Sequence, residues 1–444
     1  MMNVVVNFYS RRAAGERKGY RKPLTIVLFL LFSGIAHSQD TPGVSLEIRG
    51  PTNAIRQGDE IPIEFILHNN SKSNCTLADF TSPINIRSKG FRLTASNASG
   101  ERLPDPCAKI ATWENHGSPV VTLRPGETFS TTIPLNQWAP ITAPGDYRIA
   151  GTGPYLAQIP WCEAPPITIT VLPRTRQEMH QNVQAVTQQI EKELAQLAGQ
   201  PVPPGNLNLG PLVLKLSYTG EPEIVPTILR VLYEAGTDTG ENGDPLITST
   251  VGTCVHAGLV YFVPHSAETK QAILQAAVRQ GLNWTIYNLL TDWDFKPAEL
   301  KTLVERALGV RNPSEWAIGA RLAGRSCYDD SFTPRLVALA TTPEVPRNTR
   351  IWAFQALAIN RTDAGVKALK KLVHDPEPEM AAGLVIAISS GYGTNFTGAT
   401  GRHLKPGDLS LNDVQPLMTL LRNSSNRVPA SLLQNLTETM ARQR

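Results

Sequence analysis

The chain lacks a marked excess of either charge, and beyond its N-terminal segment it has no apolar run long enough to cross a membrane. It holds 42 basic and 38 acidic residues, a formal net charge of +4. Six of the basic residues and one acidic residue lie within residues 1–38, so the remaining chain carries about −1. A nucleic-acid partner requires a basic surface. The composition therefore predicts no nucleic-acid partner and no membrane span after removal of the N-terminal segment.

The sequence also lacks the short motifs that mark common reaction centres. It contains no Gly-x-Ser-x-Gly elbow and no His-Glu-x-x-His pair. Cys254, His256 and His265 fall short of the four closely spaced ligands of a structural zinc site. The acidic turn at 238–244 places Gly240 where an EF-hand loop needs an oxygen ligand. We therefore expect no metal, no cofactor and no catalytic residue, although a hydrolase with dispersed residues stays open because a triad need not be local in sequence.

An export signal is the clearest feature that the sequence does contain. A basic stretch is followed by 13 mainly apolar residues, 24–36, and then by small residues at Ala36 and Ser38. This order is typical of a cleavable secretory signal, and the apolar stretch is short of the roughly 20 residues of a spanning helix. We expect cleavage between Ser38 and Gln39 and a periplasmic or extracellular protein. An uncleaved N-terminal anchor is the alternative.

All five cysteines lie beyond this signal, and an oxidising compartment favours disulfides between them. They are Cys75, Cys107, Cys162, Cys254 and Cys327. Strand order predicts that the first three gather near one end of a β region, with every pairing among them open. Cys254 and Cys327 are the two cysteines of the later, helical region, and we expect a bridge between them. The odd number leaves at least one thiol free or intermolecular.

Residues 40–173 have the pattern of a β domain. Val44–Arg49 and Ile61–Leu67 alternate apolar and polar residues with the period of two that half-buried strands show. Polar turns separate about seven such runs, which predicts a β-sandwich. Tyr147 follows the Pro144-Gly145 turn in the position of a tyrosine corner.

The turns of this domain also resemble a known group of folds. Leu123-Arg-Pro-Gly-Glu127 and Ala143-Pro-Gly-Asp-Tyr147 are similar to turns of small Ig-like domains in secreted bacterial proteins, a group that includes the BsuPI-type proteinase-inhibitor fold. The resemblance extends over residues 40–173. It implies an Ig-like β-sandwich, and it leaves proteinase inhibition by this domain as an alternative function.

The periodicity changes after this domain. From Met179 to Leu197, apolar residues recur every three or four positions, as on one face of a helix. Thr175 and Glu178 have the spacing of a capping box at its start. A proline-rich stretch follows the helix. We therefore predict an amphipathic helix and a stiff linker over residues 174–210.

Residues 211–444 read as helices separated by short breaks, and the later ones repeat. A shift of 33 residues places Asp330 on Asp363 and Leu336 on Leu369. Fixed-period repetition of helix pairs predicts an α-solenoid. Residues 363–382 resemble a HEAT-type repeat of the short bacterial kind, with an apolar helix, an Asp-Pro turn and a second helix, although Ala381 stands where such repeats carry arginine. The HEAT-like pattern is clearest at 313–390, whereas the apolar residues 251–263 fit helix and strand equally.

The expected fold is therefore multidomain, an all-β Ig-like sandwich followed by an all-α solenoid. Solenoid grooves commonly bind proteins or peptides. We expect an exported, non-enzymatic binding or scaffold protein that engages another envelope or extracellular protein through residues 313–442. Lys367, Lys370 and Lys371 are interpreted as a solvated helix face. A secreted hydrolase and an inhibitor-like β domain remain the alternatives, and the oligomeric state is left open.

Overall fold

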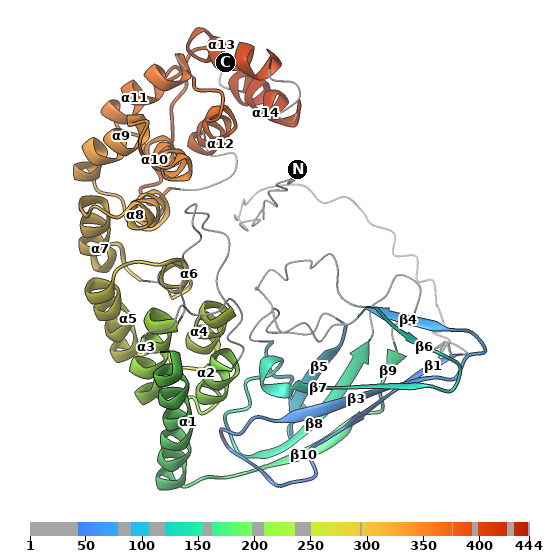
Figure 1. The fold of residues 1–444 in the computed structure, drawn as a ribbon. Helices are drawn as coiled ribbons and strands as arrows, with labels where there is room; N and C mark the ends of the chain where they lie inside the picture. The colour runs from blue at the N-terminus through green and yellow to red at the C-terminus, as the bar shows by residue number, and fades with distance from the viewer. Residues whose placement is uncertain are drawn as a thin grey trace, which may run out of the picture. The chain divides into compact units, whose positions relative to one another are not determined.

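The computed structural model describes residues 43–78, 90–105, 120–153, 162–197, 208–235, 250–293, 295–374, 376–392, 398–423 and 430–442. The predicted signal with its cleavage residues Ser38 and Gln39, the acidic turn 238–244 and Cys107 lie outside these residues. Within them, a β region is followed by a helical region (Figure 1). This order agrees with the one that the sequence predicts.

The β region contains three small sheets in its described part. The first has the order β1 (Val44–Arg49), β3 (Pro62–Asn69), β7 (Thr128–Pro134), and its neighbours are antiparallel. The second has the order β2 (Ile55–Arg56), β10 (Ile167–Leu172), β8 (Gly145–Gly153), β5 (Arg92–Asn97), with β9 (Cys162–Glu163) on the far end of β8. The third joins β4 (Cys75–Ala78) to β6 (Val120–Leu123).

The two larger sheets bury their apolar faces against each other. Alternate residues of β1 and β3, such as Ile48 and Phe65, belong to one buried cluster with Ile149 of β8. The approach is close at Gly151, where an added Cβ would lie 2.7 Å from Cγ2 of Ile48. The period of two in the sequence thus corresponds to a core shared by both sheets.

The predicted tyrosine corner has its expected hydrogen bond. The Tyr147 hydroxyl donates to the carbonyl oxygen of Ala143, four residues upstream, at 2.8 Å. The side chain is buried, and burial raises the pKa of its phenol. This bond fixes the turn that leads into β8.

Fourteen α-helices follow in the described residues, interrupted by short 3₁₀ turns. Most helices lie close to the spans that the sequence predicts, such as 267–280, 313–324 and 363–374, and residues 250–261 are helical, which settles the ambiguity at 251–263. Two helices, α2 and α6, were not predicted. The helices are α1 (Arg176–Leu197), α2 (Leu209–Ser217), α3 (Val225–Ala235), α4 (Thr250–Tyr261), α5 (Ala267–Gln280), α6 (Trp284–Asp292), α7 (Pro297–Gly309), α8 (Pro313–Arg325), α9 (Thr333–Thr341), α10 (Arg347–Ile359), α11 (Asp363–His374), α12 (Ala381–Gly391), α13 (Leu411–Asn423) and α14 (Ala430–Ala441).

The helices contact one another in two alternating series. In the odd series, α1 contacts α3, α3 contacts α5, α7 contacts α9, α9 contacts α11 and α11 contacts α13. In the even series, each helix from α2 to α12 contacts the next even-numbered helix. Pairs adjacent in the chain, such as α7 and α8 or α9 and α10, connect the two series. We call the two sets the odd layer and the even layer; Figure 1 shows them side by side along the helical region.

Helix α1 has its predicted cap and apolar stripe. Thr175 N donates to Glu178 Oε2 at 2.8 Å, and Glu178 N donates to the Thr175 hydroxyl at 3.2 Å, which together form the capping box. The apolar stripe of α1 packs on α2 and α3 within the buried cluster of the helical region. Helix α2 also begins at Leu209, inside the predicted linker 174–210. The first helix is therefore part of the helical core, because its apolar stripe needs a partner to bury it.

Candidate binding surfaces

The two layers of helices differ in where they place charge. Helices α4 and α12 of the even layer contain no acidic or basic residue other than His256, whereas α7 and α11 of the odd layer carry four or more charged residues each. Residues such as Lys367 and Lys371 of α11 are exposed, in agreement with a solvated face, and Lys370 Nζ lies 3.7 Å from Asp413. The few cations of the even layer therefore have mainly apolar side chains as neighbours.

Three consecutive helices of the even layer, α6, α8 and α10, contribute to a cluster in which aromatic rings surround an arginine. The guanidinium carbon of Arg321, on α8, lies 5.3 Å from the ring centroid of Trp284, 5.0 Å from Tyr287 and 5.4 Å from Trp352. The Trp284 ring is 5.2 Å from Tyr287 and 5.1 Å from Trp352. We call these four residues the Arg321 cluster. All three distances to Arg321 are within the range of cation–π interactions.

The residue spacing on α6 and the contacts of α8 explain how this cluster assembles. Trp284 and Tyr287 are three residues apart on α6 and so share one face. Helix α8 contacts both α6 and α10, which carries Trp352. Trp284 and Tyr287 are buried, whereas Arg321 and Trp352 are partly exposed. The rings at the base are thus fixed by the core, while the guanidinium and one indole reach the surface.

A second guanidinium belongs to the same face of α8. Arg325 is one helical turn after Arg321, and burial lowers the pKa of its guanidinium; the neighbouring charge of Arg321 acts in the same direction. The Tyr287 side chain, which interacts with the Arg325 guanidinium, acts on this pKa in the opposite direction.

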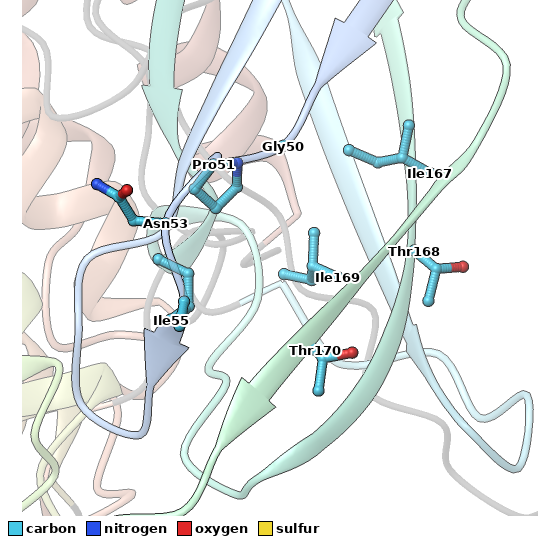
Figure 2. A pocket seen from close by; sticks show the side chains of 9 residues that line it. Gly50, Pro51, Asn53, Ile55, Ile167, Thr168, Ile169 and Thr170 are labelled. Atoms are coloured by element: carbon cyan, nitrogen blue, oxygen red, sulfur yellow. The ribbon is translucent and has the colours of Figure 1, made fainter.

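A shallow pocket of about 320 Å³ lies at an edge of the second sheet (Figure 2). It is lined by residues 50–55 on one side and 167–170 of β10 on the other. Strand β2 pairs with β10 only at Val171 and Leu172, so within the described residues no strand pairs with this side of β10 at 167–170. The lining has apolar, threonine and asparagine side chains and no titratable group. It could accept an extended peptide but offers no acid, base or nucleophile.

Two of the predicted disulfide candidates lie at one end of the β region. Cys162 Sγ is 3.6 Å from the carbonyl oxygen of Val44, which is opposite Asn69 in the first sheet. The Asn69 amide donates to the carbonyl oxygen of Leu123 at 2.9 Å, and Leu123 is opposite Cys75. Burial raises the pKa of the Cys75 thiol, and the charge of Cys162 raises it further. Cys75 and Cys162 are free thiols in the structure, and a bridge between them stays a prediction.

The other pair lies apart. Cys254 and Cys327 are both free, buried thiols, one within α4 and the other just after α8. Burial raises the pKa of Cys254 to about 12 and that of Cys327 to about 11. The residues that influence Cys327 are Asp329, Lys301 and Glu305, and Cys254 is not among them. The bridge between Cys254 and Cys327 stays a prediction without support from the geometry.

The histidines near Cys254 have ordinary partners. The Nε2 atom of His256 lies 2.9 Å from Asp292, and that of His265 lies 2.9 Å from the carbonyl oxygen of Val260. In the part of the chain that the structure describes, no group of three or more histidine, cysteine, aspartate or glutamate residues is arranged to hold a metal. None of the helices in the described ranges combines the length and apolar character needed to cross a bilayer.

Comparisons with known proteins give little further information. Protein-family models and curated protein sequences give no match. Among solved structures, native Escherichia coli α2-macroglobulin is 13% identical with a TM-score of 0.17, over 90% of this chain and 25% of that one. A second structure of the native Escherichia coli protein, from domain MG7 to the C-terminus, has the same identity and TM-score over 90% of this chain and 62% of that one. The chain thus spans less than two thirds of either, and a TM-score this low supports no argument about fold or function.

Proposed function

We propose that the protein is an exported, non-enzymatic binding protein that engages a protein or peptide partner through the even layer of its helices. The single observation that carries this proposal is the asymmetry of the layers. The odd layer carries most of the charged side chains, whereas the even layer carries few, and its helices α8 and α10 hold Arg321 and Trp352 at partial exposure. Aromatic and arginine side chains are enriched where proteins bind one another.

The alternating contacts support an α-solenoid of HEAT-like helix pairs as the architecture. In such an array each pair buries its apolar face on its neighbours, and the array has two long surfaces rather than one closed core. Arg350 of α10 adds a polar contact between successive pairs: its guanidinium donates to the carbonyl oxygen of Ala340 at 3.2 Å and pairs with Glu377 before α12. In this proposal the β region is an Ig-like sandwich that positions the array.

A crosslinking experiment in the native host tests the proposal. A photoreactive amino acid would replace Gln355 on α10 of the even layer in the full-length protein. Lys371 on α11 of the odd layer would be replaced in the same way as the matched control. We expect a discrete crosslinked partner from position 355 and none from position 371, because only the even layer presents the candidate surface.

A third position tests the alternative that the partner binds at the sheet edge of the β region. Thr168 is exposed beside the sheet-edge pocket and would report a partner that adds a strand to β10. Crosslinks from position 168 alone would move the binding site to the β region and favour the inhibitor-like alternative. Equal labelling from positions 355 and 371 would contradict a specific role of the even layer.

A further inference from the structure

We infer that the Arg321 cluster binds a carboxylate of an acidic peptide segment in the partner. The inference rests on the proposed function and assigns chemistry to the same layer. It starts from how the guanidinium of Arg321 is used within the chain. Three aromatic rings lie around it, yet within the described residues its side chain makes no hydrogen bond and no ion pair.

Ring contacts leave the donors of an arginine available. A guanidinium that interacts with aromatic rings does so through its charge and its flat faces. Its five N–H groups point outward in its own plane, and two of them match the spacing of carboxylate oxygens. None of the Arg321 nitrogens is among the buried atoms without a partner, and the residue is partly exposed. The donors are therefore accessible to a ligand from solvent.

Glu315, the acidic residue of α8, has its partners away from the Arg321 cluster. Glu315 accepts a hydrogen bond from the backbone N of Leu282 at 3.3 Å and one from the amide of Asn312 at 3.4 Å. Its carboxylate also lies 3.9 Å from Arg306 of α7, in the odd layer. Helix α8 thus brings the guanidinium of Arg321 to the face toward α6 and α10, while its own carboxylate is paired with other groups. An acidic ligand complements this charge.

The aromatic rings add an apolar contact to the charge of the site. Trp352 is partly exposed beside the guanidinium and offers an apolar surface to residues that flank the bound carboxylate. A site of this kind, with rings fixed at its base and a cation at its mouth, loses little side-chain entropy when a ligand binds. Phosphate groups also bind the arginine fork in a bidentate way, so phosphate is a competing oxyanion; the planar carboxylate is the one that a peptide segment carries without modification.

The alternative is that the cluster only braces α6, α8 and α10 against one another. Fluorescence anisotropy with the full-length exported chain distinguishes the two. The probes are labelled 12-residue peptides with three glutamates, matched peptides with three glutamines, and both sets with a free or an amidated C-terminus. We expect the glutamate peptides to bind at least about tenfold more tightly than the glutamine peptides, as one charge-assisted hydrogen bond provides. Preference for the free C-terminus alone, with equal binding of the glutamate and glutamine peptides, would assign the site to a terminal carboxylate and overturn the inference of an acidic segment.

Variants tie that preference to the cluster. R321Q should abolish the preference for glutamate, R321K should retain part of it, and K371Q on α11 should leave it unchanged. If thermal unfolding shows that R321Q is not folded, W352L provides the second variant and should weaken binding of both peptide types. Equal binding of glutamate and glutamine peptides, or an R321Q protein that still prefers glutamate, would overturn the inference. Crosslinks from position 355 in that case would show that the proposed function stands without it.

Discussion

The β region and the helical region build their cores in opposite ways. In the β region, residues far apart in sequence pair directly, as Ile55 does with Val171. In the helical region, the main contacts join helices that are one or two places apart in the chain. Pairing of distant segments closes a core, so one destabilising substitution affects the whole unit. Packing between neighbouring helices leaves long open faces, and a destabilising substitution there acts mainly on the adjacent helices. The difference indicates why the candidate ligand site lies on the helices.

The largest expected effect comes from the cysteines that the β region brings together. We predict a disulfide between Cys75 and Cys162 in protein oxidised by glutathione disulfide, with both thiols oxidised and the glutathione disulfide reduced. Closing the chain between these residues contributes about 4 kcal/mol of stability in the chain-entropy model. Peptide mapping without reduction identifies the bridge, and unfolding with and without reductant measures its effect.

The helical region supplies the internal control for that experiment. Cys254 within α4 and Cys327 just after α8 are both buried and should react with an alkylating reagent only after unfolding. A bridge from Cys107 to either Cys75 or Cys162 in the mapped peptides would contradict the predicted pairing.

A slightly smaller effect is expected from filling the contact between the two larger sheets. Gly151→Val places a Cβ 2.7 Å from Ile48 and 3.0 Å from Phe65. Both side chains belong to the closed core, so we expect a loss of about 3 kcal/mol, at the upper end for overpacking. Urea unfolding followed by near-ultraviolet circular dichroism checks the loss.

Gly309→Ala provides the comparison in the helical region. An added Cβ there meets no atom within 4 Å, so this variant should be as stable as the unaltered protein or slightly more so. A similar loss of stability in both variants would show that the two regions do not differ as their contacts suggest.

Periodicity made much of this organisation predictable from the sequence. The period of two in Val44–Arg49 and the stripe of α1 each require one buried face, and the structure buries both. The hydrogen bond of Tyr147 and the capping box at Thr175 were predictable because each depends on residues only a few positions apart.

Helices α2 and α6 were not predicted, because their sequences favour other structures. Helix α2 begins with Leu-Gly-Pro, which reads as a turn, and α6 has the sequence Trp-Thr-Ile-Tyr, which favours strands. A signal for α6 was present in Asn283, whose side chain accepts a hydrogen bond from Ile286 N at 2.9 Å as an N-cap. The Arg321 cluster depends on the packing of three helices, one of them α6, so spacing along the chain could not reveal it.

The smallest effect concerns the junction where the β region passes into the helices. Thr175→Ala removes the hydroxyl that caps α1, and the loss of such an N-cap costs about 1 kcal/mol. Glu178 of the same capping box also pairs with Arg56 of β2 at 2.7 Å, so the cap connects the helix to the β region. Ser410→Ala is the matched change at α13, where Ser410 and Asp413 form the same reciprocal bonds without a β-region partner. We expect hydrogen exchange to increase in both α1 and β2 for Thr175→Ala, whereas for Ser410→Ala the increase should stay within α13 and its neighbour α11, with none in the β region. Exchange that rises in α1 alone would show that the capping box stabilises its helix without coupling the two regions.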